Sequence, residues 1–329
     1  MRICLIGEYS GSLDEGMRNV TSCLYKGLSN RHTVLPLDTK KVSLHWLKKI
    51  KEFDPEIIHY AHGPSIISLI VMHVLASRSN AKTVISATQP RFSSLTKRFI
   101  PLFKPNLILT QSYGADGMFK ELGCVTEFLP NGVDIDRFVP VSKMIKERLR
   151  EKYGVDKDKF VIVHVGSIRS RRNIQIFSKI QEIEGVQVVI AGSTSMPMEQ
   201  ISYKHLLESG CVIWRRYFEN VEEIYQLSDC YVFPATNLLS AIELPLSVLE
   251  AMSCNLPVIS TKFGALPRIF EEGDGLLFVD NEDDVIDAVE KIKNTDVNIG
   301  TRENVLLYAW DNIVRRLEGI YEEIISERK

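Results

Sequence analysis

The sequence contains few cysteines, and they form no recognisable pattern. The six of them are scattered, mostly within apolar runs, and no CxxC or Cys/His pair has the spacing of metal ligands. A disulfide scaffold and a structural zinc module are therefore excluded as classes, and we expect reduced thiols in the core of a cytoplasmic protein. The positions are Cys4, Cys23, Cys124, Cys211, Cys230 and Cys254.

Long apolar runs and a strong charge imbalance are also missing. No stretch reaches the roughly 18 consecutive apolar residues of a membrane span, and the longest candidate, residues 66–76, includes His73. The N-terminus leads straight into a predicted strand, so we expect no secretory leader. The formal net charge is −2, and no nucleic-acid partner is expected. Residues 1–140 hold 17 Lys and Arg against 12 Asp and Glu, which favours an anionic partner for that part.

The GxGxxG pattern of dinucleotide-binding dehydrogenases is absent, because the first glycines have a different spacing. The chain does contain strand-like apolar runs, such as 2–7, alternating with amphipathic segments, such as 44–53, which is typical of an α/β protein. Its 329 residues predict two domains of about 150 residues. A metal pair is not expected at His59 and His62, because alternation along a strand over 57–62 places them on opposite faces.

A strand–helix–strand unit is predicted over residues 230–261. Apolar runs at each end indicate buried strands, and residues 246–254 between them have helical spacing before Asn255 stops the helix. In a parallel sheet such a helix begins at the carboxyl ends of the strands, where its first N–H groups and positive dipole end bind anions. We therefore expect an anion site at the backbone of Leu246 and Ser247.

Two carboxylates accompany this helix. Glu250 lies about one turn beyond the helix start on the same face, and Glu243 lies just before the helix. An ionised carboxylate only accepts hydrogen bonds, so it suits sugar or ribose hydroxyls, and the pair favours a ligand with both phosphate and sugar. The alternative for Glu243 is a solvated loop residue.

A basic loop follows another predicted strand, residues 160–166. Its sequence is SIRSRRN, and it holds Arg169, Arg171 and Arg172. Three guanidinium groups this close repel one another unless an anion neutralises them, and their donor geometry matches phosphate oxygens. The loop is a second candidate for an anion site, and its alternative is a solvated basic loop.

Two motifs resemble those of the retaining glycosyltransferases of family 4, which have the GT-B fold. They are LEAMSCNLPVI at 249–259 and PNGVDIDRFVP at 130–140, and the resemblance extends over nearly the whole chain. It implies an α/β architecture with two Rossmann-like domains facing an interdomain cleft. Residues 1–140 would form the acceptor domain and residues 141–305 the nucleotide-sugar donor domain, with a C-terminal helix within 306–329 crossing back to the first domain.

The resemblance also implies catalytic and donor-binding roles. Arg172, assisted by Arg169 and by the amides of Leu246 and Ser247, would hold the diphosphate of the donor. Glu250 would bind the ribose diol. Each of these residues stands at a position that matches the family motif or lies beside it.

Four further positions complete the implied site. Glu243 would bind hydroxyls of the donor sugar, and Gly16 would let the backbone approach the donor phosphates. His62 and Thr88 would line the cleft that holds the sugar or the acceptor. A glycine at a loop–helix junction is also common for conformational reasons alone, and His62 has the alternative of a hydrogen-bonded core histidine.

The chain departs from the family pattern at several of these positions. Only six residues separate Glu243 from Glu250 where the family has seven, and Thr88 stands where the family usually has histidine. Further departures are Ser167 for Arg, Arg172 for Lys, Asn173 for Gly, Glu15 for Gly, Pro245 for Gly, Gln89 for Asp and Arg268 for Glu.

The implied reaction moves a hexose from a UDP- or GDP-sugar to a hydroxyl of a sugar or lipid-linked acceptor. It retains the anomeric configuration, and it uses no cofactor because the nucleotide sugar is itself a substrate. Asp134 and Asp136 form a DxD pattern, but they lie in a predicted linker turn, so no metal site is expected. Two alternatives are a catalytically degenerate protein that binds a nucleotide sugar or a partner, and a sugar-nucleotide epimerase of the same architecture.

Residues 91–104, RFSSLTKRFIPLFK, combine basic and aromatic side chains. Such a stretch can lie on an anionic membrane surface, which would place the protein at the inner face of the membrane and imply a lipid-linked acceptor. Pro101 would interrupt the stretch as a single helix. The alternative is an ordinary surface helix whose aromatic side chains pack into the core.

Overall fold

The computed structural model describes residues 1–43, 45–90, 93–295 and 299–326. Leu44, at the start of the helix predicted over 44–53, lies outside these residues, and so do Arg91 and Phe92 of the basic and aromatic stretch. The chain forms two compact units, which are described separately. Unit 1 consists of residues 1–132, 242–244 and 310–329, and unit 2 consists of residues 133–241 and 245–309.

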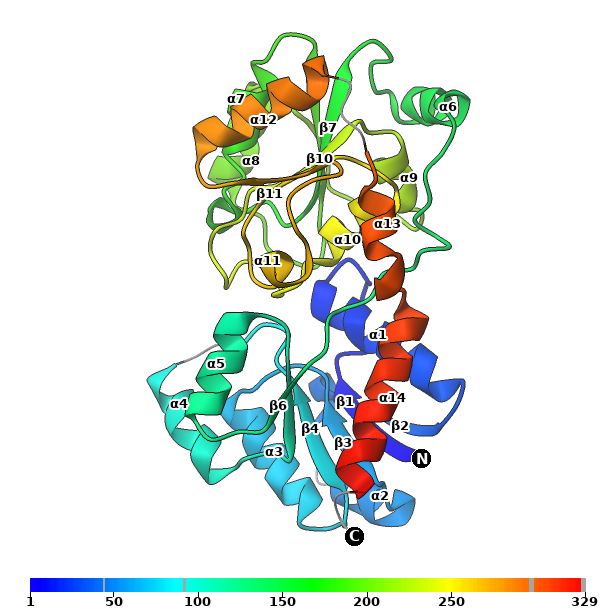
Figure 1. Cartoon of the computed structure of the whole chain (residues 1–329), viewed down its shortest axis with the longest axis vertical. Coiled ribbons are helices and arrows are strands. Elements are labelled where there is room, and N and C mark those ends of the chain that lie inside the picture. Colours follow the sequence, from blue (N-terminus) through cyan, green and yellow to red (C-terminus); the bar gives the residue numbers. More distant parts are fainter. Residues whose placement is uncertain (44, 91–92, 296–298, 327–329) are drawn as a thin grey trace. The chain divides into compact units, whose positions relative to one another are not determined.

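Unit 1 is built on a parallel sheet of six strands in the order β2-β1-β3-β4-β5-β6 (Figure 1). Its central strands are almost continuously apolar, because a parallel sheet with helices on both faces buries both sides of each strand. The strands are β1 (Arg2–Gly7), β2 (Thr33–Asp38), β3 (Ile57–Tyr60), β4 (Lys82–Ser86), β5 (Leu107–Thr110) and β6 (Thr126–Phe128).

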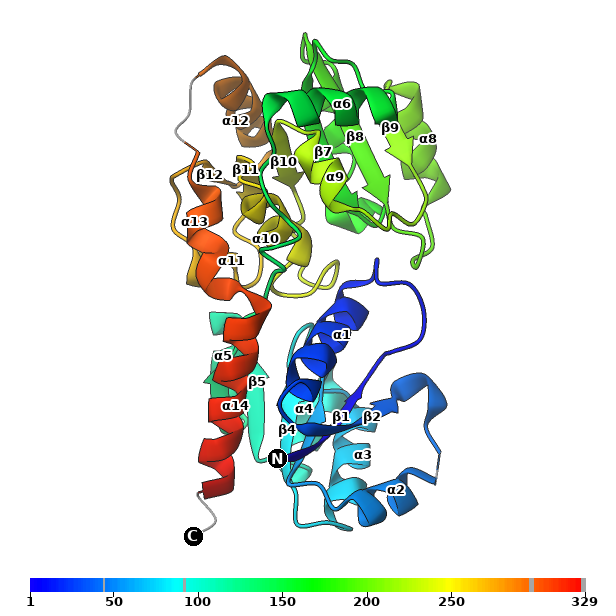
Figure 2. The same cartoon turned by 90° about the vertical axis from the view of Figure 1, so that its right-hand side faces the viewer.

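Helices cover both faces of this sheet (Figure 2). One face carries α2 (His45–Phe53), α3 (Ile66–Ala76), α4 (Ser94–Phe99) and α5 (Tyr113–Glu121), whose apolar side chains share a core with Cys4 and Ile6 of β1. The neighbouring strand residues point the other way, toward α1 (Gly16–Ser29) and α14 (Trp310–Ser326).

The C-terminal helix α14 is anchored deep in unit 1. The hydroxyl of Tyr321 lies 2.6 Å from Nδ1 of His59, whose Nε2 lies 2.8 Å from the hydroxyl of Ser86. A Cβ added at Gly27 of α1 would come within 2.6 Å of Val314, so a glycine is needed for the two helices to pack this closely. His59 is therefore a fully hydrogen-bonded core histidine.

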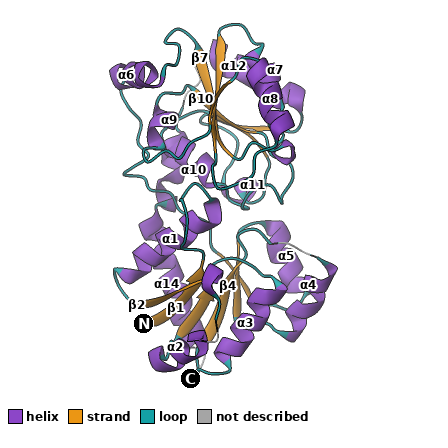
Figure 3. Ribbon diagram, turned by 180° about the vertical axis from the view of Figure 1, so that it is seen from behind, coloured by secondary structure: helices purple, strands orange, loops and turns teal. Residues whose placement is uncertain are grey.

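Unit 2 is built on a second parallel sheet of six strands, in the order β12-β11-β10-β7-β8-β9 (Figure 3). Its strands are β7 (Phe160–Gly166), β8 (Val186–Gly192), β9 (Val212–Trp214), β10 (Cys230–Phe233), β11 (Val258–Thr261) and β12 (Leu276–Val279). Its α-helices are α6 (Lys143–Tyr153), α7 (Ile176–Gln181), α8 (Gln200–Glu208), α9 (Glu222–Gln226), α10 (Leu246–Ser253), α11 (Leu266–Ile269), α12 (Glu282–Asn294) and α13 (Thr301–Val305). Two parallel sheets flanked by helices confirm the predicted α/β class.

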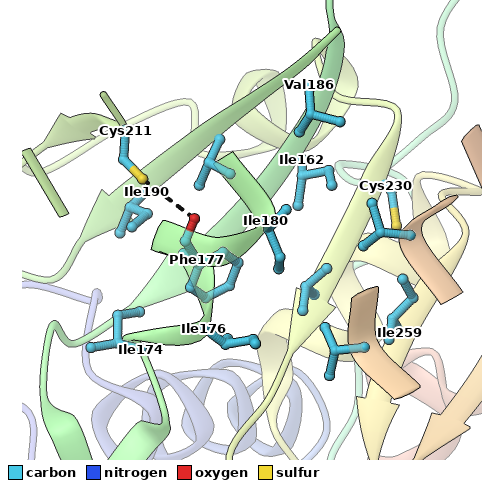
Figure 4. Close-up of a cluster of buried hydrophobic side chains, with 14 of the residues drawn as sticks. Ile162, Ile174, Ile176, Phe177, Ile180, Val186, Ile190, Cys211, Cys230 and Ile259 are labelled. Atoms are coloured by element: carbon cyan, nitrogen blue, oxygen red, sulfur yellow. Dashed lines mark hydrogen bonds between the residues drawn. The ribbon is translucent and has the colours of Figure 1, made fainter. Parts of the chain in front are cut away.

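The core of unit 2 packs aliphatic side chains of α7 against β7, β8 and β10 (Figure 4). Within it, the thiol of Cys211 contacts the carbonyl of Phe177 at 3.6 Å, and burial raises the pKa of that thiol to about 12. All six cysteines are free, and five of them are buried. They serve as small apolar core residues, as their positions in apolar runs predicted.

Candidate functional site

The strand order of unit 2 reverses between β7 and β10, which lie side by side. In open parallel sheets, ligands bind outside the carboxyl ends of the strands at this reversal, because the two following loops diverge there and leave room. The loop after β7 contains the arginines predicted to bind an anion, and the loop after β10 leads into α10. The fold of unit 2 therefore brings both predicted anion-binding segments to one place.

Arg172 lies across the end of β7. It closes a 3-10 turn over Ser170–Arg172, and its Nε donates a hydrogen bond of 3.1 Å to the carbonyl of Ser240 in the loop after β10. A Cβ added at Gly166 would collide with Nη1 of Arg172, and the φ of Gly166 is +153°, so both space and backbone conformation require glycine. The guanidinium group is thus held against the backbone at the carboxyl end of β7.

Arg169 has a different neighbour. Its Nε donates to the carbonyl of Pro197 at 3.0 Å, while the adjacent N–H of Ser170 donates to the carboxylate of Glu199 at 2.7 Å. Arg169 and Arg172 lie in the same loop but contact two different segments, through Pro197 and Ser240 respectively. Asn173 ends the turn in the left-handed conformation with φ of 55°, which asparagine tolerates better than most residues and which accounts for its place where the family has glycine.

Helix α10 begins without a side-chain cap, because its N-cap residue is Pro245. The first amides of the helix, at Leu246 and Ser247, are therefore not satisfied by the residue that usually satisfies them. The side chain of Ser247 is held by a hydrogen bond, since the hydroxyl of the buried Tyr231 on β10 donates to Oγ of Ser247 at 2.7 Å. This arrangement leaves an electropositive helix start with a pre-positioned hydroxyl.

Glu250 lies one turn further along α10, and its carboxylate accepts a hydrogen bond from a second tyrosine. The hydroxyl of Tyr225, a fully buried residue of α9, donates to its carboxylate at 2.7 Å. Burial raises the pKa of Glu250 to about 7, although the Tyr225 hydrogen bond and the positive charge of Arg137 act in the opposite direction. Near neutral pH, this carboxyl group is therefore divided between its charged and uncharged forms.

Two buried polar atoms beside Arg172 have no hydrogen-bond partner among the described residues. They are Nε2 of His164 and Oγ of Ser240. Burial lowers the pKa of His164 to about 3, so its imidazole is neutral and offers one free ring nitrogen. Unpaired buried polar atoms are uncommon in folded proteins, and a bound polar ligand would satisfy both of these.

In unit 1 the strand order reverses between β1 and β3, and His62 follows β3 at that point. β3 ends at Tyr60, so His62 lies in the loop and not in the strand predicted over 57–62. Its Nε2 accepts from the backbone N–H of Glu8 at 3.2 Å, and its buried Nδ1 has no partner within the described part of the chain. Burial lowers its pKa, so the neutral form dominates.

Residues 242–244 pack within unit 1 rather than unit 2. The N–H of Glu243 donates to the carbonyl of Thr88 at 2.7 Å, and the N–H of Leu244 donates to the side chain of Gln111 at 3.2 Å. Asn131 completes the network through a hydrogen bond of 2.8 Å to the carbonyl of Leu244. Thr88 is itself buried, and its hydroxyl oxygen has no partner among the described residues.

The carboxylate of Glu243 is engaged by Ser112. One oxygen accepts from the backbone N–H of Ser112 at 3.1 Å and the other from its hydroxyl at 2.7 Å, at the start of α5. Glu243 is buried, so it is not the solvated loop residue that was the alternative. The two hydrogen bonds from Ser112 fix the orientation of this carboxylate, and each of its oxygens keeps a second lone pair.

Gly16 begins α1, and its neighbour Glu15 caps that helix. The carboxylate of Glu15 accepts from the N–H groups of Met17 and Arg18 at 3.3 and 2.9 Å. A negative charge thus already occupies the helix start, which disfavours the expected approach of donor phosphates to Gly16. A Cβ on Gly16 would lie 3.2 Å from Ile242, so the structure places Gly16 beside the segment that also carries Glu243 and contacts Thr88.

Comparison with known proteins agrees with this geometry. The model of the family described as "Glycosyl transferases group 1" matches residues 145–305, which contain the loop after β7, all of α10 and both tyrosines.

Residues 145–305 belong to the group 1 glycosyltransferases.

Relatives of the chain include the D-inositol 3-phosphate glycosyltransferase of Corynebacterium jeikeium. It is 28% identical over 223 residues, which are 61% of this chain and 52% of that protein. The N-acetyl-alpha-D-glucosaminyl L-malate synthase of Bacillus anthracis is 26% identical over 196 residues, which are 55% of this chain and 50% of that protein. The chain thus spans about half the length of these two relatives.

Solved structures show the same fold as this chain. The Anabaena protein HepE in complex with UDP and glucose matches with a TM-score of 0.76 at 16% identity, over 98% of this chain and 100% of that one. The sucrose-phosphate synthase of Thermosynechococcus elongatus matches with a TM-score of 0.78 at 14% identity, over 99% and 100% of the two chains. These likenesses confirm the GT-B fold.

Several site residues of the group 1 domain were not predicted. Tyr231 and His164 lie in predicted buried strands and Ser240 follows one of them, while Tyr225 lies in α9, a helix that was not predicted. Nothing in the local pattern indicates that a tyrosine on β10 directs its hydroxyl to α10, because that direction depends on packing between the two elements.

No group of three or more His, Cys, Asp and Glu is placed to hold a metal ion in the described part of the chain.

Proposed function

We propose that the protein is a retaining, metal-independent glycosyltransferase that moves a hexose from a UDP- or GDP-sugar to a hydroxyl acceptor. Unit 2 would bind the donor, and unit 1 would contribute the acceptor contacts. The relatives named above are glycosyltransferases, and the fold neighbour HepE was solved with UDP and glucose, which supports a nucleotide-sugar donor.

One observation carries this proposal. Arg172 follows β7 and the uncapped start of α10 follows β10, and these two strands are adjacent at the reversal of the unit 2 sheet. Arg172 also donates a hydrogen bond to Ser240 in the loop that joins β10 to α10. A diphosphate provides negative charge for the guanidinium group, acceptors for the amides of Leu246 and Ser247, and partners for the orphan atoms nearby. No apolar or cationic ligand would satisfy this set.

The chemistry requires positive potential at the leaving group. As the bond between the anomeric carbon and the phosphate oxygen breaks, negative charge grows on the departing diphosphate, and Arg172 and the helix start stabilise it. One aimed donor of this kind contributes roughly 3 to 4 kcal/mol to the transition state. The acceptor oxygen bonds to the anomeric carbon on the same face, and its proton passes to the departing phosphate oxygen.

Glu250 would recognise the ribose. Its carboxylate in the charged form accepts from both hydroxyls of a diol, and Tyr225 would hold that carboxylate in place. We propose a positioning role for Glu243, because Ser112 donates to each of its oxygens and so fixes the carboxylate at the start of α5. We propose that Gly16 serves close packing against Ile242, because a Cβ at this position would lie 3.2 Å from that side chain.

On the acceptor side, His62 and Thr88 are the proposed contacts, since each offers a buried polar atom without a partner in the described residues.

We propose more specifically that the acceptor is lipid-linked. Among the relatives is the alpha-galactosylglucosyldiacylglycerol synthase of Streptococcus pneumoniae, 26% identical over 144 residues, which are 40% of this chain and 36% of that protein. No helix in the described residues is both long and apolar enough to span a membrane.

The test measures donor hydrolysis and transfer with UDP-glucose, UDP-N-acetylglucosamine and GDP-mannose, and follows the anomeric proton of the product by NMR. We expect turnover with one of these donors and an unchanged α configuration. Glu250→Ala and Arg172→Ala should remain folded and lose that turnover. Binding without turnover by the wild type would favour the degenerate binding protein, and an altered free nucleotide sugar would favour the epimerase.

A further inference from the structure

Unit 1 exposes an apolar helix face that no described residue covers. Helix α3 is apolar along almost its whole length, and its inner side, which includes Leu69 and Met72, packs into the core. Its outer side exposes Ile67, Ile70 and Val74, and the exposed fraction of Ile67 is 67%. The spacing of these three residues places them on one stripe of the helix. A helix that is apolar on every side usually has partners on every side.

Helix α3 packs against α4 and the segment that follows it, and both of these also expose apolar side chains. The ring of His73 on α3 contacts the ring of Phe103 at 5.2 Å between centroids, and α3 and α4 lie next to each other in unit 1 (Figure 1). Beside this contact, Leu95 and Leu102 are exposed, the latter at 68%. We call the five exposed apolar residues of this region the α3–α4 face. They are Ile67, Ile70, Val74, Leu95 and Leu102.

The chain segment that carries the α3–α4 face contains charged residues of a single sign. The 59 residues from 57 to 115 contain no Asp or Glu, although the whole chain has 42 among 329 residues. The same stretch contains six Lys and Arg, and among these the described side chains of Arg78, Arg98 and Lys104 are exposed. Such a surface attracts an anionic partner and repels a basic one.

We propose that the α3–α4 face docks on an anionic lipid bilayer. Apolar side chains that enter the acyl boundary, with basic side chains at headgroup level, are the combination that binds peripheral proteins to membranes. A protein partner explains the face less well, because protein interfaces usually pair charges of both signs.

The role of α3 was not predicted, since only residues 91–104 were identified as a possible membrane contact. The structure adds α3 as the larger apolar part of the surface and leaves Arg91 and Phe92 outside the description. Ile67 follows the acceptor candidate His62 by five residues, at the start of the next helix. The biological reason for docking rests on the proposed function, because a lipid-linked acceptor is reached only from the bilayer surface.

The test is sedimentation of the full chain with vesicles of phosphatidylcholine alone or with a quarter phosphatidylglycerol, without donor or acceptor. We expect binding to the anionic vesicles only, weakened as NaCl rises from 0.05 to 0.5 M. The variant Ile67→Ser/Ile70→Ser should lose on the order of tenfold in affinity per isoleucine. Arg98→Gln/Lys104→Gln should lose about fivefold per charge.

The matched control is Ile201→Ser/Lys204→Gln on α8 of unit 2, where the isoleucine is 87% exposed and the lysine is also exposed. It should bind vesicles like the wild type. Equal binding to both vesicle types, or an equal loss in the α8 control, would overturn the proposal. So would absence of vesicle binding together with a dimer that Ile67→Ser/Ile70→Ser dissociates, since the face would then be a protein interface.

Nucleotide-sugar binding by calorimetry, in the absence of vesicles, separates this proposal from the preceding one. All three double variants should bind the donor like the wild type, because none of the changed residues lies in the donor site. A wild type that binds anionic vesicles but no nucleotide sugar would refute the proposed function and leave the docking surface standing. The reverse result would refute only the docking surface.

Discussion

The hydroxyl of Tyr225 is expected to set the pH at which the protein binds its donor. Tyr225→Phe removes one oxygen and leaves a ring that packs against Phe138 and Tyr231 at centroid distances of 5.8 Å. What changes is the hydrogen bond to Glu250, whose pKa is about 7. A hydrogen bond to a charged group contributes about 1.5 to 3 kcal/mol. Its loss should therefore raise the pKa of Glu250 by roughly one to two units.

The sign follows from the form that binds ribose. If the charged carboxylate accepts from the diol, donor affinity falls below the pKa of Glu250 by up to tenfold per pH unit. In the wild type the inflection should lie near pH 7. In Tyr225→Phe it moves upward, so that affinity at pH 7 falls by about fivefold or more.

The assay is calorimetric titration between pH 5.5 and 8.5 with a nucleotide sugar. A free nucleoside diphosphate is unsuitable, because a terminal phosphate itself titrates near pH 6. Tyr231→Phe is the matched control, since its hydroxyl contacts Ser247, which does not titrate. It should weaken binding without moving the inflection.

A second control should move the inflection in the opposite direction. The carboxylate of Glu222 on α9 raises the pKa of Glu250, so Glu222→Gln should lower the pH of the inflection. The charged and titratable groups around Glu250 are Arg137, Glu222, Tyr225, Tyr231, Cys254 and Arg302. An unchanged inflection in both Tyr225→Phe and Glu222→Gln would refute the assignment of Glu250 to the ribose.

Other expectations can be checked with single substitutions. Arg172→Ala should lower kcat by on the order of a hundredfold or more with little change in melting temperature, whereas Arg169→Ala, whose side chain contacts a different segment, should lower it much less. Gly166→Ala should resemble Arg172→Ala in kinetics, because the added Cβ displaces that guanidinium group; normal kinetics would contradict the geometry. Ser112→Ala should destabilise unit 1 by about 1 to 2 kcal/mol in urea unfolding, since α5 loses its N-cap side chain and Glu243 loses the hydrogen bond from the hydroxyl. Glu243→Gln keeps an acceptor for Ser112 and should retain turnover, and an abolished kcat with normal unfolding would return Glu243 to the sugar site.

Much of the donor region was predictable because its signals are local. Helix α10 was predicted over 246–254 and occupies Leu246–Ser253, and Asn255 beyond it takes the left-handed conformation with φ of 57° that stops a helix. The basic loop was predicted to follow a strand, and it does follow β7. Apolar periodicity and a stop residue are written into a few neighbouring positions, so they survive without knowledge of the rest of the fold.

Other parts of the site were beyond a sequence-based prediction. Glu243 was predicted to bind sugar hydroxyls, and the sequence did not indicate that its oxygens accept from Ser112, which lies 131 residues earlier in the chain. Gly16 was expected near phosphates, but the carboxylate of Glu15 already caps that helix. Each outcome depends on which polar group happens to lie within 3 Å, and spacing along the chain does not determine that distance.

The sequence by itself determined the alternation of strands and helices, and with it the two parallel sheets and the loops at their carboxyl ends. Only the tertiary structure decided that Tyr225 and Tyr231 reach α10 and that residues 242–244 pack in unit 1. It also decided that one side of α3 stays uncovered. Periodicity encodes which face of an element is apolar, whereas hydrogen-bond partners, burial and pKa depend on contacts between residues far apart in the chain.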